Sequence, residues 1–132
     1  MKKIETTWHY LLNSALTERK FKHTQQELAV QFGYSLSTIN HALKGPTQIG
    51  AIRKASKFFV LEDFQILLYF WASLRNLEKD IIYKTYVDES VNQIESEVPP
   101  RAVYAAYSAG RKILGLAPAD YSKVYICLKE NN

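Results

Sequence analysis

Positively charged side chains are concentrated in residues 1–60 of this chain. Nine Lys and Arg are set against three Asp and Glu there, a net charge of +6, whereas residues 61–132 contain eight Lys and Arg and ten Asp and Glu, a net charge of −2. Ammonium and guanidinium groups attract phosphates and other anions, so this asymmetry favours a polyanionic partner for the N-terminal part alone. The alternative interpretation is a solvated basic surface without a partner.

The same region contains a stretch, residues 24–45, with the spacing of two helices joined by a tight turn. Ala29 allows the first helix to pass close to the second, and Gly33 accepts the positive φ that the turn requires. Ile39 then falls on the inward side of the second helix. This is the spacing of a helix-turn-helix, a unit that places one helix in the major groove of DNA.

Capping residues define where these two helices begin. Thr24 and Glu27 form a capping box at the start of the first helix, and Ser35 is a good N-cap for the second. Gly45-Pro46 is expected to end the second helix. The buried stripe of that helix is predicted to consist of Leu36, Ile39 and Leu43.

Further elements are predicted on both sides of this stretch. Apolar residues at helical spacing predict an amphipathic helix over 3–18. Two short extended runs, 50–54 and 57–61, surround a turn at Ala55-Ser56 and carry several positive charges, which predicts a basic β-hairpin. A basic hairpin that directly follows the second helix of such a motif is the wing of a winged helix.

The next segment is unusually apolar. Residues 63–77 predict a helix with large apolar side chains on nearly every side, and Glu62 and Asp63 stand at its positive end. One core-facing stripe needs only about half of these apolar side chains. We therefore expect the excess to be covered by the C-terminal part of the chain, by another subunit, or by both.

The pattern changes beyond residue 78. We predict a strand over 80–86, a helix over 88–97 that ends at Pro99-Pro100, a helix over 101–114 and a strand over 122–128. The predicted fold class is therefore α+β, an N-terminal winged helix-turn-helix with a small C-terminal β-α-α-β unit. The corresponding divisions are 1–62 for DNA binding, 63–78 for connection or dimerisation, and 79–132 for the small α+β unit.

The helix-turn-helix stretch resembles that of bacterial repressors, whose pattern is Ala-x-x-x-Gly-x-Ser-x-x-Thr-Ile. The matching residues are Ala29, Gly33, Ser35, Thr38 and Ile39, and the resemblance covers about 22 residues. One departure is Ala42, where the family usually has a larger aliphatic residue. Either Leu43 compensates for it or the helix is rotated slightly.

This resemblance implies which side chains would contact DNA. Ser37 and His41 would face base edges, and Asn40 suits a bidentate contact with adenine. Leu36 fits either the DNA side or the core, and we expect the core. The full set comprises Thr24, Gln25 and Gln26 for phosphates, Ser35, Leu36, Ser37, Thr38, Asn40, His41 and Lys44 in the second helix, and Arg53, Lys54 and Lys57 in the wing. Ser37, Asn40 and His41 could alternatively be solvated surface residues.

The C-terminal half faintly resembles antitoxin-like regulators of the AbiEi type, which combine a winged helix with a non-catalytic, nucleotidyltransferase-like domain. The resemblance is carried by Leu67-Leu68-x-Phe70-Trp71-Ala72 and Ala119-Asp-Tyr-x-Lys-Val-Tyr-Ile126. The Gly-Ser turn and the Asp-x-Asp pair that nucleotidyl transfer would need do not occur.

Other chemistries have little support in the sequence. The three histidines show no ligand spacing with Cys127 or with paired carboxylates, so we expect no metal site. Because no phosphate-binding or nucleophile motif occurs, we expect no cofactor and no enzyme activity. The longest apolar run, 66–72, is far shorter than the roughly 20 residues that span a bilayer. One cysteine and no apolar N-terminal signal favour the cytoplasm.

The sequence thus predicts a transcriptional repressor that binds a specific sequence of double-stranded DNA as a homodimer. The alternative is an antitoxin-like interaction module that binds a partner protein and regulates its own synthesis through DNA. A third hypothesis is a subunit of a nucleic-acid enzyme or a replication factor, which would prefer single strands or forks to duplex DNA.

Overall fold

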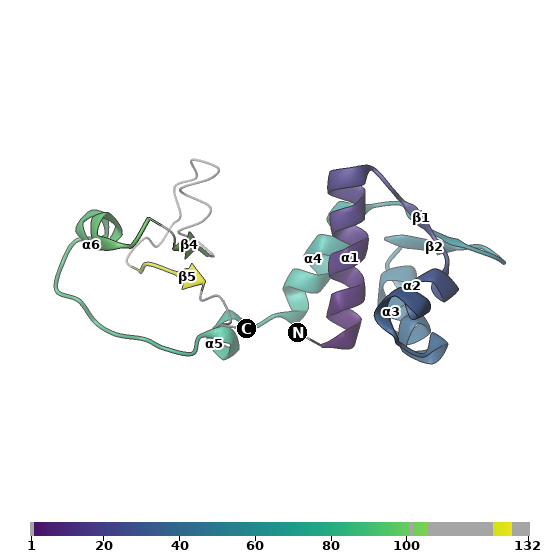
Figure 1. Cartoon of the computed structure of the whole chain (residues 1–132), viewed down its shortest axis with the longest axis horizontal. Coiled ribbons are helices and arrows are strands. Elements are labelled where there is room, and N and C mark those ends of the chain that lie inside the picture. The colour runs from purple at the N-terminus through teal and green to yellow at the C-terminus, as the bar shows by residue number, and fades with distance from the viewer. Residues whose placement is uncertain (1, 101, 106–122, 128–132) are drawn as a thin grey trace. The chain divides into compact units, whose positions relative to one another are not determined.

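The computed structural model describes residues 2–100, 102–105 and 123–127, and the chain divides into two compact units, residues 1–81 and 82–132 (Figure 1). The regular structure of the described residues consists of helices and small antiparallel sheets, so the fold class is α+β. The elements of the first unit are α1 (Lys3–Glu18), β1 (Lys22–His23), α2 (Gln25–Phe32), α3 (Leu36–Gln48), β2 (Ile52–Lys54), β3 (Phe59–Leu61), α4 (Phe64–Leu74) and α5 (Leu77–Asp80).

Helix α1 has the predicted bounds, and its apolar stripe is part of the core of the first unit. Trp8, Leu11, Leu12 and Ala15 are all buried, and they pack with Leu28 of α2 and with Ile39 and Leu43 of α3. Their spacing of three and four residues places them on one face of the helix. Burial of this face holds α1 against the other helices of the unit.

The sheet of this unit has the strand order β1-β3-β2, and both pairs are antiparallel. The predicted hairpin is confirmed as β2 and β3, with Ile52 opposite Leu61 and Lys54 opposite Phe59. Strand β1 was not predicted, because a strand of two residues has no periodicity that could reveal it.

The prediction that Gly45-Pro46 ends the second motif helix is wrong, since α3 continues to Gln48 with Pro46 inside it. A proline has no N–H to donate to the carbonyl four residues earlier, which here belongs to Ala42. The indole N–H of Trp8 donates to that carbonyl oxygen instead, at 2.7 Å in a buried position. The bond that Pro46 cannot make is thus replaced from another helix.

Gly45 has a packing role in the same place. A Cβ at this position would lie 2.6 Å from the Cζ atom of Phe70, so any larger residue would require the Phe70 ring to shift. The Phe70 ring meets the Trp8 ring edge-on at a centroid distance of 5.3 Å. Ala42, the departure from the repressor pattern, and its neighbour Leu43 are both fully buried.

Helix α4 lies alongside α1 (Figure 1) and is shorter than the predicted 63–77. The Asp63 side chain caps it by accepting a hydrogen bond from the backbone N–H of Ile66. Leu67 is fully buried, and Phe70 and Trp71 pack on the core. Large apolar side chains on its other sides are exposed, as their number in the sequence led us to expect: Phe64, Ile66, Leu68, Tyr69 and Leu74.

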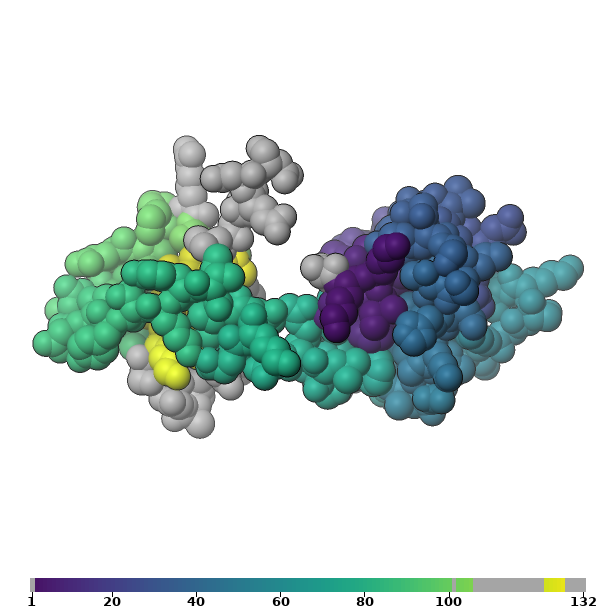
Figure 2. Space-filling model, turned by 90° about the horizontal axis from the view of Figure 1, so that it is seen from below, coloured from purple at the N-terminus to yellow at the C-terminus, as the bar shows by residue number. Residues whose placement is uncertain are grey.

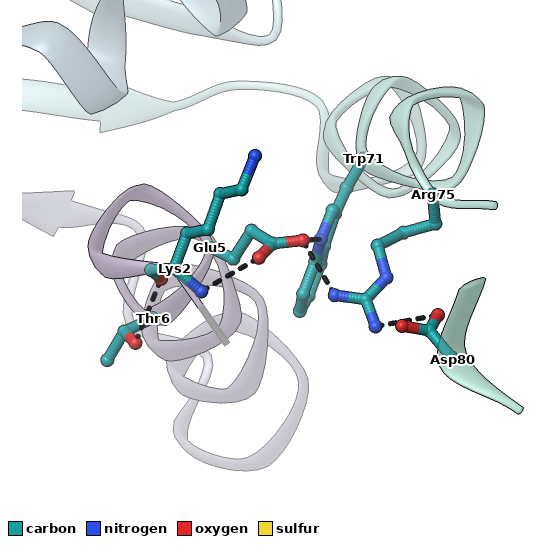
Figure 3. A network of polar contacts seen from close by, with 6 residues as sticks. All are labelled: Lys2, Glu5, Thr6, Trp71, Arg75 and Asp80. Carbon is teal, nitrogen blue, oxygen red and sulfur yellow. Dashed lines mark hydrogen bonds and ion pairs between the residues drawn. The ribbon is translucent and has the colours of Figure 1, made fainter. Parts of the chain in front are cut away.

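A polar network joins the start of α1 to the residues that follow α4 (Figure 3). Oε1 of Glu5 accepts hydrogen bonds from Nη1 of Arg75 at 2.7 Å and from the indole N–H of Trp71 at 3.1 Å. Its Oε2 accepts from the backbone N–H of Lys2, and Nη2 of Arg75 lies 2.8 Å from Oδ2 of Asp80. The hydrogen bond from Arg75, ahead of the other contacts, lowers the pKa of Glu5 to about 2.

The second unit differs from the predicted β-α-α-β order. The strand predicted over 80–86 is wrong, because α5 includes Asp80 and no regular structure follows over 81–87. The helix predicted over 88–97 is confirmed as α6 (Val91–Glu97), capped by Ser90. The spacing of Val91 and Ile94 and the polar cap are local signals, which explains why this helix could be predicted.

The helix predicted over 101–114 is wrong in its described part. Val103 and Tyr104 form β4, which pairs antiparallel with β5 (Ile126–Cys127), while 106–114 lie outside the described residues. β5 falls within the strand predicted over 122–128. The cross-strand partner of β4 is distant in the sequence, so local spacing could not reveal it. The small residues of this segment therefore suggested a helix wrongly. No helix in the described part of the chain is both long and apolar enough to cross a membrane.

Replacing Trp8 by Phe should lower the free energy of unfolding by about 1 to 3 kcal/mol, because a buried carbonyl loses its donor. In a Pro46→Ala background the cost should be smaller, since the introduced alanine supplies the missing N–H within the helix. Urea unfolding of the two single variants and the double variant measures this coupling. An equal cost of Trp8→Phe in both backgrounds would show that the two sites are independent.

Glu5→Gln should lower the free energy of unfolding at pH 7 by roughly 1 to 2 kcal/mol through loss of charge-assisted hydrogen bonds. The pKa of Glu5 is lower in the folded chain, so its contribution is complete above about pH 5 and is lost as the pH falls toward 2. Denaturant unfolding between pH 7 and 3 should show the two proteins converging. Glu18→Gln, an exposed acid on the same helix, is the control and should change little.

Candidate nucleic-acid interface

The turn between α2 and α3 is built from the local signals that the sequence contains. The Thr24 hydroxyl accepts from the backbone N–H of Glu27 at 3.1 Å, and Ser35 accepts from the backbone N–H of Thr38 at 3.2 Å. Gly33 has φ +67, the left-handed conformation that glycine adopts without steric cost. Only the Thr24 half of the predicted capping box is formed, because the carboxylate of Glu27 points to Lys20 and His23 instead.

Helix α3 has one buried and one exposed face. Ile39, Ala42 and Leu43 are fully buried, whereas the polar residues predicted to face outward are exposed, namely Ser37, Asn40, His41 and Lys44. Within the described residues these side chains come together on a single helix face, as their spacing predicts. The sequence therefore located the polar face of α3 correctly.

The prediction that Leu36 belongs to the buried stripe is wrong, because 56% of its surface is exposed. Leu36 is the first residue of α3. Helical side chains tilt toward the N-terminus, so a residue in the first turn points beyond the helix end instead of onto a preceding turn. Leu36 consequently adds an apolar group to the exposed face.

Two of the proposed contact residues, Ser35 and Thr38, take part in capping. The Ser35 hydroxyl lies 3.0 Å from the Ser37 hydroxyl and 2.9 Å from the Thr38 hydroxyl. Thr38 is also half-buried, as are Thr24 and Gln25 at the start of α2, whereas Gln26 is exposed. Because these hydroxyls are engaged in capping, they stabilise the N-terminus of α3 and are less available to bond a ligand.

The three basic residues of the hairpin have different surroundings. Nε of Arg53 lies 2.5 Å from Oε1 of Glu62, so much of its charge is compensated locally. Nζ of Lys54 donates to Oδ1 of Asn40 at 2.7 Å, which connects the hairpin to the exposed face of α3. Lys57 is exposed in the turn. The hairpin projects from the rest of the first unit in the space-filling view (Figure 2).

Two lysines that the sequence analysis counted only as charge are positioned by aromatic rings. Nζ of Lys22 lies 4.1 Å from the centroid of the Phe58 ring at the hairpin, and Nζ of Lys3 lies 5.2 Å from that of Tyr34 in the turn after α2. Cations are attracted to the faces of such rings. No sequence signal could have identified these pairs, because their members are far apart along the chain.

His23 is buried and acts as part of the core. Its ring stacks on Phe59 and meets the edge of Tyr10, and neither ring nitrogen has a hydrogen-bond partner within the described residues. Burial and the nearby Lys20 lower the pKa of His23, although the Glu27 carboxylate at 3.5 Å opposes this. No group of three or more His, Cys, Asp or Glu that could hold a metal occurs in the part of the chain that the structure describes.

Comparison of the chain with protein-family models, with curated proteins and with solved structures gave no match. The function of this protein is therefore inferred from the charge, the exposure and the contacts of its own residues.

Proposed function

We propose that this protein is a winged helix-turn-helix regulator that binds specific double-stranded DNA and represses transcription. The observation that carries the proposal is the exposed polar face of α3 with a basic hairpin directly beside it. In this proposal α2 and α3 are the helix-turn-helix, α3 is the recognition helix, and the hairpin of β2 and β3 is the wing. The element order from α1 to β3 and the strand order β1-β3-β2 agree with such a unit.

The chemistry of the exposed face suits the edges of base pairs. Ser37 and His41 can both donate and accept hydrogen bonds, and Lys44 can donate to guanine or to phosphate. Phosphates would be bound by Gln26 near the N-terminus of α2 and by Lys57 in the hairpin. The net charge of +6 over residues 1–60 would draw this face to the duplex.

We propose further that the protein acts as a homodimer through the outward side of α4. Tyr69 and Leu68 are 70% and 46% exposed there, and Ile66 is 37% exposed. In a dimer with two-fold symmetry, the same apolar patch of each subunit would be buried against that of the other. Such a dimer would also place two α3 helices on two DNA half-sites. The second copy is therefore the occupant that fits both the surface and the proposed activity.

A selection of bound fragments from a random DNA library tests the proposal of specific binding. The wild type should enrich a defined site, and a variant with Ser37, Asn40 and His41 all changed to Ala should lose the preference while it keeps the fold. Lys57→Ala should weaken binding to all sequences equally and lower the magnitude of the salt slope by about 1. An unchanged preference in the triple variant would reject α3 as the reading helix.

Sedimentation equilibrium tests the proposed dimer. The wild type should be a dimer, and a variant with Leu68→Glu and Tyr69→Glu should be a folded monomer, because charges at the interface centre repel and lose solvation. Leu16→Glu is the matched control, since Leu16 is 62% exposed on α1, and this variant should stay dimeric. A monomeric wild type, or a dimeric double variant, would exclude an α4 interface.

A further inference from the structure

We propose that Asn40 and Lys54 act together as a guanine-reading pair in the major groove, an inference that rests on the proposed DNA binding. The pair is defined by one contact, in which Nζ of Lys54 donates to Oδ1 of Asn40 at 2.7 Å. An ammonium group has donors only, so this contact determines the orientation of the amide. Oδ1 faces the lysine, and the Nδ2 amino group faces away from it.

The alternation of side chains along β2 explains why Lys54 makes this contact. Ile52 and Lys54 point to the same face of the strand, because successive side chains alternate, and Ile52 is buried. Lys54 therefore points to the side on which α3 lies, whereas Arg53 points to the other side and pairs with Glu62. No ion pair involves Lys54 among the residues described here, so no carboxylate compensates the charge of its ammonium group.

The chemical consequence is a surface that offers donors. A bidentate contact of asparagine with adenine needs Oδ1 to accept from the adenine N6 amino group while Nδ2 donates to N7. Here Oδ1 is bonded to a cation, and the positive charge beside it repels the amino groups of adenine and cytosine. The Asn40 amino group and the remaining ammonium hydrogens instead match O6 and N7 of guanine, which are both acceptors.

The inference therefore differs from the expectation for Asn40 alone. A free asparagine at this position would prefer adenine, whereas the pair should prefer guanine by about 10-fold. Lys54 is then the residue that determines specificity, although it lies outside the recognition helix. The prediction distinguishes the pair from a merely electrostatic contact of Lys54 with phosphate, which would carry no base preference.

Selection from a random DNA library with four proteins tests this inference. The Asn40→Ala variant should lose preference at one position of the site and so identify the base that Asn40 reads. The wild type should select guanine there. Lys54→Met should move the preference at that same position to adenine, because the freed amide can then accept from N6. Lys57→Met is the matched control and should weaken binding without changing the preferred base.

Three results would overturn the inference. Adenine selected by the wild type at the Asn40 position, no preference there, or guanine retained by Lys54→Met would each show that the two residues do not act as a pair. If the wild type enriches no sequence at all, the proposed function itself fails, and this outcome is distinct from enrichment of a site with the wrong base. Thermal unfolding checks that each variant, at a position exposed in the structure, keeps the wild-type fold.

Discussion

One buried hydrogen bond, from the indole N–H of Trp8 to the carbonyl oxygen of Ala42, joins α1 to α3 where Pro46 interrupts the backbone bonding of α3. Pro46 leaves that carbonyl without its helical partner, and an unsatisfied buried carbonyl would oppose folding. The same indole contacts Phe70 of α4, which in turn packs over Gly45 of α3. Three helices thus meet at one side chain, and the exposed face of α3 is held in a single orientation relative to α1.

Two polar contacts in this unit join residues that are distant in sequence. Glu5 at the start of α1 accepts from Arg75 beyond α4, and Asn40 of α3 accepts from Lys54 of β2. The first contact stabilises the fold, because the Glu5 side chain is buried although Arg75 is 40% exposed, while the second is exposed on both sides and contributes little to stability. Its importance lies in the proposed recognition of DNA, where it sets the orientation of an amide.

Much of the first unit could be predicted because its signals are local. The start of α1, the Thr24 and Ser35 caps and the left-handed Gly33 each depend on residues within four positions of one another. Two errors occurred where a distant partner overrides the local preference: α3 continues through Pro46, and Val103 and Tyr104 pair with β5 in place of the predicted helix. The error at Leu36 has a local cause, because this residue is the first of α3 and has no preceding turn to pack on. The predicted contacts with DNA stay predictions.

By itself the sequence determined the separation of charge along the chain, the starts of the capped helices α2 and α3, and the polar residues Ser37, Asn40, His41 and Lys44 that α3 exposes. These features follow from residue type and from spacings of three or four residues, which the backbone geometry of a helix converts directly into faces. Only the tertiary structure decided that α3 passes through Pro46 and that the Asn40 amide is oriented by a lysine. The donors in those two contacts are 34 and 14 residues from their acceptors, so they meet only when the chain has folded.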